Sequence, residues 1–133
     1  MKNLQLSLKT KWFEMTKSGV KTEDYREITH YWIRILLISY REIDYVDFQD
    51  IVTDLQDPLK RHRNIDEVFK YWELNFKNFG SNIMTLGYPK KEDTKRILRL
   101  KHKGIEIRTG NPEWGAEANK LYFVILHGSE AVA

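Results

Sequence analysis

The sequence contains no cysteine, which excludes disulfide bonds, thiolate metal sites and cysteine nucleophiles. A chain without cysteine suits a reducing compartment. The densest apolar run, Ile33 to Ile38, is interrupted by Arg34 and is far too short to cross a membrane. Residues 1–7 alternate polar and apolar side chains and lack the continuous apolar core of a signal peptide. We therefore expect a soluble, cytoplasmic protein without a membrane partner.

Several motifs of catalysis are also missing. The sequence has no glycine-rich phosphate loop of the Walker or dinucleotide type and no serine in a nucleophile-elbow motif. Its histidines, at positions 30, 62, 102 and 127, lack the spacing of metal ligands. We expect no metal and no cofactor, and any catalysis would rest on Lys21 with a carboxylate.

The 133 residues correspond to one ordinary domain, which we expect to span 1–133, and 41% hydrophobic content excludes a disordered chain. The net charge is only +3, but it is unevenly distributed. Residues 90–108 hold eight Lys or Arg against three acids, whereas residues 42–57 hold six acids and no Lys or Arg. The basic stretch either attracts an anionic partner or is an ordinary solvated strand face.

Alternating or apolar segments predict five strands, and residues between them favour helices. The alternation changes phase near Gly104, where a bulge or a turn is needed. Residues 128–133 are expected to be a loose tail. The expected strands are Leu4–Leu8, the segment near Lys21–Arg26, Ile83–Tyr88, Lys95–Thr109 and Leu121–Leu126.

The middle of the chain favours helices. Thr10 is a candidate cap for a short helix that Gly19 ends, His30 to Ile38 begins as a helix, and a third helix ends before Pro58. A further apolar stripe predicts a buried helical face formed by Ile65, Val68, Phe69, Trp72 and Phe76. The class is therefore α+β, with a mostly antiparallel and closed sheet.

Two stretches near the chain ends are similar to one family. The first is a strand and helix followed by Gly19-Val20-Lys21-Thr22-Glu23-Asp24-Tyr25-Arg26 and by residues 27–32. The second runs from Gly104 through Glu113-Trp114-Gly115-Ala116 to the last strand. Their order resembles the ASCH domains, a branch of the PUA-like proteins. Residues 36–78 have no counterpart in this resemblance and are expected to be a helical insertion.

The resemblance implies a PUA-like, mostly antiparallel β-barrel with flanking helices and a cleft near the Gly-x-Lys loop. Relatives bind RNA, and one bacterial branch hydrolyses N4-acetylcytidine with a lysine, a threonine and a glutamate. Lys21 matches that lysine and Arg26 matches the motif arginine. Asp24 stands at the threonine position, where it approximates the acidic residue of other members.

On this basis we expect Lys21, Asp24 and Arg26 to line one cleft. In an extended segment Asp24 and Arg26 point to the same side, so the carboxylate could accept a hydrogen bond from a base edge. Arg26 could hold this carboxylate or grip a phosphate. The alternative is a structural ion pair that fixes the mouth of the barrel.

Trp114 and Glu113 complete the expected ligand-binding set. Trp114 lies in a glycine-rich loop, where it could stack on a base or plug one end of the barrel. Glu113 is a possible second carboxylate.

Three functions follow as hypotheses. The first is a module that binds RNA or a modified nucleoside without cleaving it. The second is a small metal-free amidohydrolase acting on N4-acylated cytidine. The third is a protein–protein adaptor that uses the helical insertion.

Overall fold

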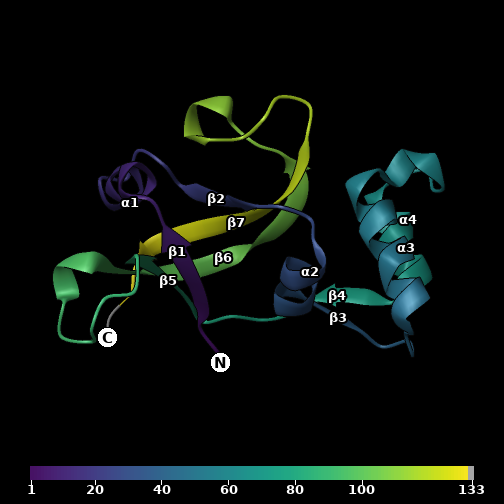
Figure 1. Ribbon diagram of the computed structural model, residues 1–133, viewed down its shortest axis with the longest axis horizontal. Coiled ribbons are helices and arrows are strands. Elements are labelled where there is room, and N and C mark those ends of the chain that lie inside the picture. Colours follow the sequence, from purple (N-terminus) through teal and green to yellow (C-terminus); the bar gives the residue numbers. More distant parts are fainter. Residues whose placement is uncertain (132–133) are drawn as a thin grey trace. The chain divides into compact units, whose positions relative to one another are not determined.

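Five strands form one mixed sheet, in the order β1-β5-β6-β7-β2, in the computed structural model, which describes residues 1–131 (Figure 1). The α+β class is confirmed, and each of the five expected segments contains a strand, although residues 87–88 and 95–96 lie outside the strands. The closed, PUA-like barrel remains a prediction. The strands are β1 (Leu4–Leu8), β2 (Glu23–Arg26), β5 (Ser81–Leu86), β6 (Ile97–Thr109) and β7 (Leu121–Glu130).

The pairing of the strands explains why the sheet is mixed. β1 runs parallel to β5, with Leu6 opposite Met84, and β5 runs antiparallel to β6, with Met84 opposite Leu98. The leucines of β1 alternate with exposed residues and are buried, as a period of two requires. β6 is continuous through Gly104, whose positive φ of 131° marks the point where the sequence pattern changes phase.

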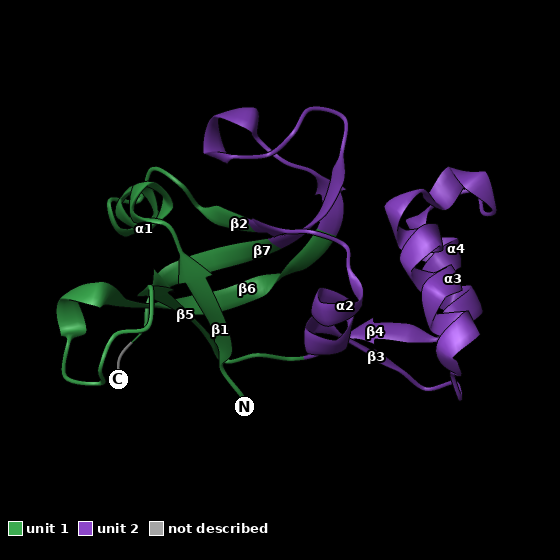
Figure 2. Ribbon diagram, in the orientation of Figure 1, with its two compact units in different colours: residues 1–24, 78–106, 125–133 green, residues 25–77, 107–124 purple. Residues whose placement is uncertain are grey.

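The chain divides into two compact units that interleave along the sequence (Figure 2). Unit 1 comprises residues 1–24, 78–106 and the described part of 125–133, and unit 2 comprises residues 25–77 and 107–124. The three strands β2, β6 and β7 each contribute residues to both units.

Unit 1 packs helix α1 (Thr10–Lys17) near β5. Phe13 on the helix and Met84 on β5 are almost completely buried. A short 3-10 helix, η2 (Thr94–Arg96), leads into β6. The core of unit 1 is therefore made by one helix face and the apolar positions of the strands.

Unit 2 holds three helices, α2 (His30–Leu36), α3 (Tyr45–Gln56) and α4 (Ile65–Trp72). The 3-10 helix η1 (Pro58–Lys60) follows α3 directly, and η3 (Pro112–Trp114) lies in the loop before β7. α3 packs against both α2 and α4. Trp72 is buried as expected, whereas Phe69 is half-buried and contacts Phe76 with ring centroids 5.1 Å apart.

Two local expectations are wrong. The helical stripe does not extend to Phe76, because Glu73 adopts a left-handed conformation with φ 53° and ends α4. Phe76 instead belongs to strand β4 (Leu74–Phe76), which pairs antiparallel with β3 (Leu37–Ser39). Thr10 is the first helical residue of α1 and not its cap.

The expected tail begins later than predicted. β7 continues to Glu130, and the backbone N–H of Ala131 donates to the carbonyl of Arg99 at 3.0 Å. The remainder of this expectation, residues 132–133, lies outside the described residues. Within residues 1–131, no helix has both the length and the apolar character needed to span a membrane.

Candidate functional site

Helix α1 and the turn that follows it carry Lys21 into the interior of unit 1. Gly19 has φ 84°, a conformation that glycine adopts without strain, and its N–H donates to the carbonyl of Thr16 at 3.1 Å. The N–H of Lys21 donates to the carbonyl of Met15 at 3.0 Å. These bonds fold the chain back on the helix, and the Lys21 side chain is only 2% exposed.

Lys21 is buried beside a carboxylate. Its Nζ donates to the carbonyl oxygen of Glu23 at 2.6 Å and lies 3.5 Å from Oδ1 of Asp24, which is also buried. The Trp12 ring is 5.9 Å from the same Nζ. A buried ammonium group is strongly unfavourable unless a carboxylate and hydrogen-bond acceptors surround it. The interior of unit 1 therefore holds the ammonium group of Lys21 and the carboxylates of Glu23 and Asp24.

A cavity of about 380 Å³ lies beside Lys21. α1 and the following turn form one wall, Leu98 and Leu100 of β6 form an apolar wall, and the end of β7 contributes His127. A concave site of this size, with apolar walls and a few polar groups, is typical of a small-molecule site. Its lining residues are Thr16, Lys17, Gly19, Lys21, Thr22, Leu98, Leu100, His127, Gly128 and Glu130.

Two larger hollows are less suitable candidates. One, of about 680 Å³, lies in unit 1 beside η2 and β6, and the other, of about 820 Å³, lies in unit 2 around η1. Neither is lined by a buried charged side chain. The cavity beside Lys21 is distinguished by buried polar groups, which carry specificity in binding sites.

His127 belongs to a chain of side-chain hydrogen bonds within unit 1. Its Nδ1 is 2.8 Å from Nδ2 of Asn82, and Oδ1 of Asn82 is 2.7 Å from Nδ1 of His102. Asn82 is completely buried, and its Nδ2 also donates to the carbonyl of Leu126 at 3.2 Å. The rings of both histidines are thus held by one buried amide.

Burial lowers the pKa of His127 to about 4, and the Lys21 and His102 charges act in the same direction. The carboxylates of Asp24 and Glu23 oppose this shift without overcoming it. Burial also lowers the pKa of His102. Both imidazoles are therefore neutral at pH 7.

Of the five residues expected in the site, Lys21 and Asp24 are brought together in unit 1. The other three belong to unit 2, so the prediction of a single shared cleft stays a prediction. The Arg26 guanidinium lies 4.9 Å from the centre of the Trp32 ring. Glu113 is exposed and Trp114 is half-buried, both in η3.

Asn82 and His127 were not singled out in the sequence. The only signal for them is a polar residue at a buried position of an otherwise apolar strand, because Asn82 lies in β5 and His127 lies near the end of β7. Among residues 1–131, no three His, Cys, Asp or Glu side chains form a group able to hold a metal ion.

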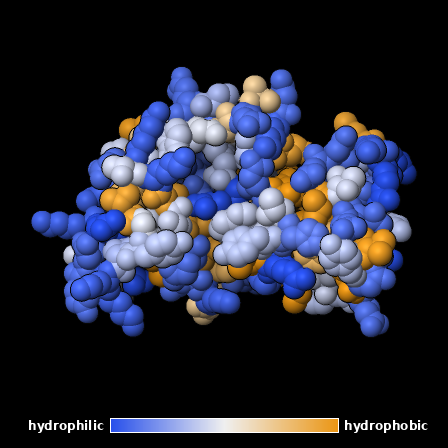
Figure 3. All heavy atoms as spheres, in the orientation of Figure 1, coloured by the Kyte–Doolittle hydropathy of each residue, from blue (hydrophilic) through white to orange (hydrophobic). Residues whose placement is uncertain are grey.

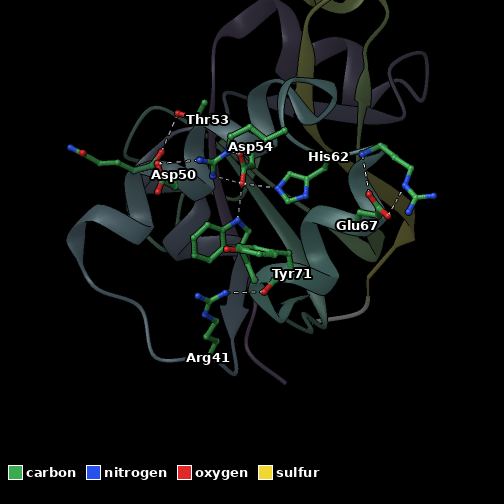
Figure 4. Close-up of polar contacts among 11 residues, drawn as sticks. Arg41, Asp50, Thr53, Asp54, His62, Glu67 and Tyr71 are labelled. Carbon is green, nitrogen blue, oxygen red and sulfur yellow. Dashed lines mark hydrogen bonds and ion pairs between the residues drawn. The ribbon is translucent and has the colours of Figure 1, made fainter.

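Unit 2 contains a second buried carboxylate, Asp54, which is only 1% exposed (Figure 4). Arg61 donates to it twice, at 2.8 and 2.9 Å, and Nε1 of Trp72 donates at 2.9 Å. Nε2 of His62 lies 3.0 Å from the same carboxylate. Burial acts to raise the pKa of Asp54, but hydrogen bonds from Arg61, Trp72 and His62 outweigh it and the pKa is lowered. Asp54 therefore ties α3 to α4 and the loop between them.

The surface mixes polar and apolar side chains (Figure 3). Several large side chains of unit 2 are exposed, with Tyr40 at 71% and Leu59 at 74%.

Comparison with protein-family models, with curated proteins and with solved structures finds no match to this chain.

Proposed function

We propose that the cavity beside Lys21 binds a nucleoside, either free or within RNA, without cleaving it. The observation that carries this proposal is the buried Lys21, which pairs with Asp24 and lines a cavity whose size suits one nucleoside. Leu98 and Leu100 offer an apolar wall for a planar base. The resemblance to ASCH domains supports the same conclusion.

Three basic side chains of β6 that do not line the cavity favour an anionic backbone outside it. Along β6, the exposed residues Arg99, Lys101 and Lys103 alternate with the less exposed Leu98 and Leu100. A Cβ on Gly128, which lines the cavity, would lie 3.1 Å from Lys101 Cβ and from Lys103 Cγ. Alternation puts these lysines on the face of β6 opposite Leu98 and Leu100, and in this proposal they contact phosphates of a backbone that runs outside the cavity.

Binding is favoured over hydrolysis because the residue three positions after Lys21 is Asp24. The hydrolase branch to which the chain shows resemblance uses a threonine there. Asp24 can accept a hydrogen bond from a base, but it provides no hydroxyl group. Release of acetate from N4-acetylcytidine by the wild-type protein would overturn this part of the proposal.

A protein–protein adaptor is the second candidate function. It is favoured by the exposed side chains of unit 2, which include Tyr40, Tyr45, Val46, Leu59 and Tyr71. Self-association or a co-purifying protein that is insensitive to salt would support it.

The test of the first proposal is a binding screen by calorimetry with free nucleosides, modified nucleosides, short RNA and short DNA at two salt concentrations. We expect at least one nucleoside to bind, and RNA binding to weaken steeply as salt rises. Binding of no nucleoside and no RNA at either salt concentration would contradict the proposal.

A further inference from the structure

The imidazole of His127 carries an unused hydrogen-bond donor. His127 is 8% exposed, it lines the cavity beside Lys21, and its buried Nε2 has no hydrogen-bond partner within residues 1–131. Leaving a buried polar group without a partner is unfavourable, so such a group requires an explanation.

The hydrogen bonds of Asn82 determine which nitrogen of His127 holds the proton. A carbonyl oxygen only accepts, so the amide nitrogen of Asn82 must face Leu126. The same Nδ2 then donates to Nδ1 of His127, and Oδ1 of Asn82 accepts from Nδ1 of His102. Because Nδ1 of the neutral His127 ring accepts, its Nε2 carries the hydrogen.

We propose that His127 is a specificity-determining residue whose Nε2–H donates to a carbonyl oxygen of a nucleobase bound in the cavity. This inference rests on the proposed nucleoside-binding function and adds the chemistry of recognition. A neutral donor suits a neutral carbonyl acceptor, whereas cations such as Lys101 and Lys103 bind a phosphate more strongly. The carbonyl-bearing nucleosides are uridine, cytidine and guanosine, and adenosine has no carbonyl on its base.

The charged groups around His127 agree with this assignment. Lys21, Asp24, Glu23 and His102 are the groups whose fields act on the ring. Burial is the largest cause that keeps the imidazole neutral, and the opposing effects of these charges do not overcome it, so the donor keeps its proton throughout the neutral pH range. The Asn82 bond prevents the ring from presenting Nε2 as an acceptor.

Two substitutions of His127 separate the donor from the rest of the ring. Asparagine can place an oxygen near the position of Nδ1 and so keep the bond to Asn82, but it has no group at the position of Nε2. Glutamine can place an amide N–H close to the position of Nε2. We expect H127N to weaken binding of the best-bound carbonyl nucleoside about 3- to 10-fold, and H127Q to restore it to within about twofold.

The experiment is calorimetric titration of wild type, H127N and H127Q with uridine, cytidine, guanosine, adenosine and inorganic phosphate. Wild-type binding with equal affinities for H127N and H127Q would overturn the role of His127 and leave the proposed function intact. Absence of any wild-type binding would overturn both.

A measurement on the wild-type protein does not depend on how the variants fold. Long-range ¹H–¹⁵N NMR of the imidazole should show a protonated Nε2 and an unprotonated Nδ1 at pH 7. The Nε2 proton resonance should shift when the carbonyl nucleoside is added and stay unchanged with inorganic phosphate. A protonated Nδ1 in the free protein would contradict the assignment.

Discussion

The two buried carboxylate clusters differ in how fully their polar groups are paired. Asp54 in unit 2 has Arg61, His62 and Trp72 around its oxygens at 2.8–3.0 Å. The cluster in unit 1 pairs Asp24 with Lys21, which lines a cavity, and Nε2 of His127 at the same cavity has no hydrogen-bond partner within residues 1–131. The comparison teaches that a buried charge alone does not indicate a site. The proposed site rests instead on a buried donor without a partner beside a cavity.

The largest expected effect tests the structural role of Asp54. D54A should lower the free energy of unfolding by about 3–5 kcal/mol, because it leaves the buried Trp72 and the largely buried His62 without their shared acceptor. Urea denaturation measures this loss. D50A is the matched control, because Asp50 is partly exposed, lies 3.9 Å from Arg61 and should cost less than about 1 kcal/mol. Equal effects of the two substitutions would show that burial of Asp54 contributes no special stability.

Two substitutions of Trp72 distinguish the contribution of packing from that of hydrogen bonding in the same cluster. W72A removes a buried aromatic side chain and should cost about 3–5 kcal/mol. W72F keeps most of the packing but removes the Nε1–H that donates to Asp54, and should cost about 1–3 kcal/mol. An unchanged thermal midpoint for W72A would show that the helical face has been misinterpreted.

The pH dependence of stability distinguishes the two clusters. The folded pKa of His127 is about 4, below its ordinary value of 6.5. The contribution of the neutral ring to the free energy of unfolding is therefore complete above pH 6.5 and is lost as the pH falls toward 4. The loss reaches about 3 kcal/mol. His102, whose pKa is also lowered, adds to the loss in the same direction.

Asp54 acts in a lower pH range, because its pKa is lowered from 3.8 and its stabilisation is lost only as the pH falls below that value. Urea denaturation of wild type and H127N between pH 7 and 4 measures how much of the pH dependence of stability comes from His127. H127N should show a flatter profile than wild type. The same slope in both proteins would contradict a buried, neutral His127.

Gly19 gives the smallest expected effect. A Cβ at this position would meet no atom within 4 Å, so G19A should cost only the backbone strain of its positive φ, about 1–2 kcal/mol. Because the turn presents Lys21, G19A should also weaken nucleoside binding. G104A is a useful control, since Gly104 has a positive φ and an equally open Cβ position but does not line the cavity.

The sequence was sufficient for the elements whose pattern is local. Alternation located β1 and most of β6 and β7, and helical spacing located α3 and α4 up to Trp72. The β3–β4 pair was missed because each strand has three residues and their pairing joins positions 37–39 to 74–76. Such short strands are stabilised by a distant partner and leave almost no periodic signal.

The candidate site was only partly predictable for a similar reason. Lys21 and Asp24 are close in the sequence, and the motif that contains them predicts both as site residues. The His102–Asn82–His127 chain joins three different strands, so no spacing in the sequence reveals it. The burial of Lys21 also depends on long-range packing, which composition does not show.

The most direct test of the central claim is nucleoside binding by Lys21→Met. The double variant Lys21→Met/Asp24→Leu serves as a control for folding, because it removes the buried ammonium group together with the carboxylate that pairs with it. We predict that wild type binds, that both variants lose at least about tenfold in affinity, and that exposed Lys2→Met binds as wild type does. Unchanged nucleoside affinity in a folded Lys21→Met protein would contradict the claim that this cavity is the binding site.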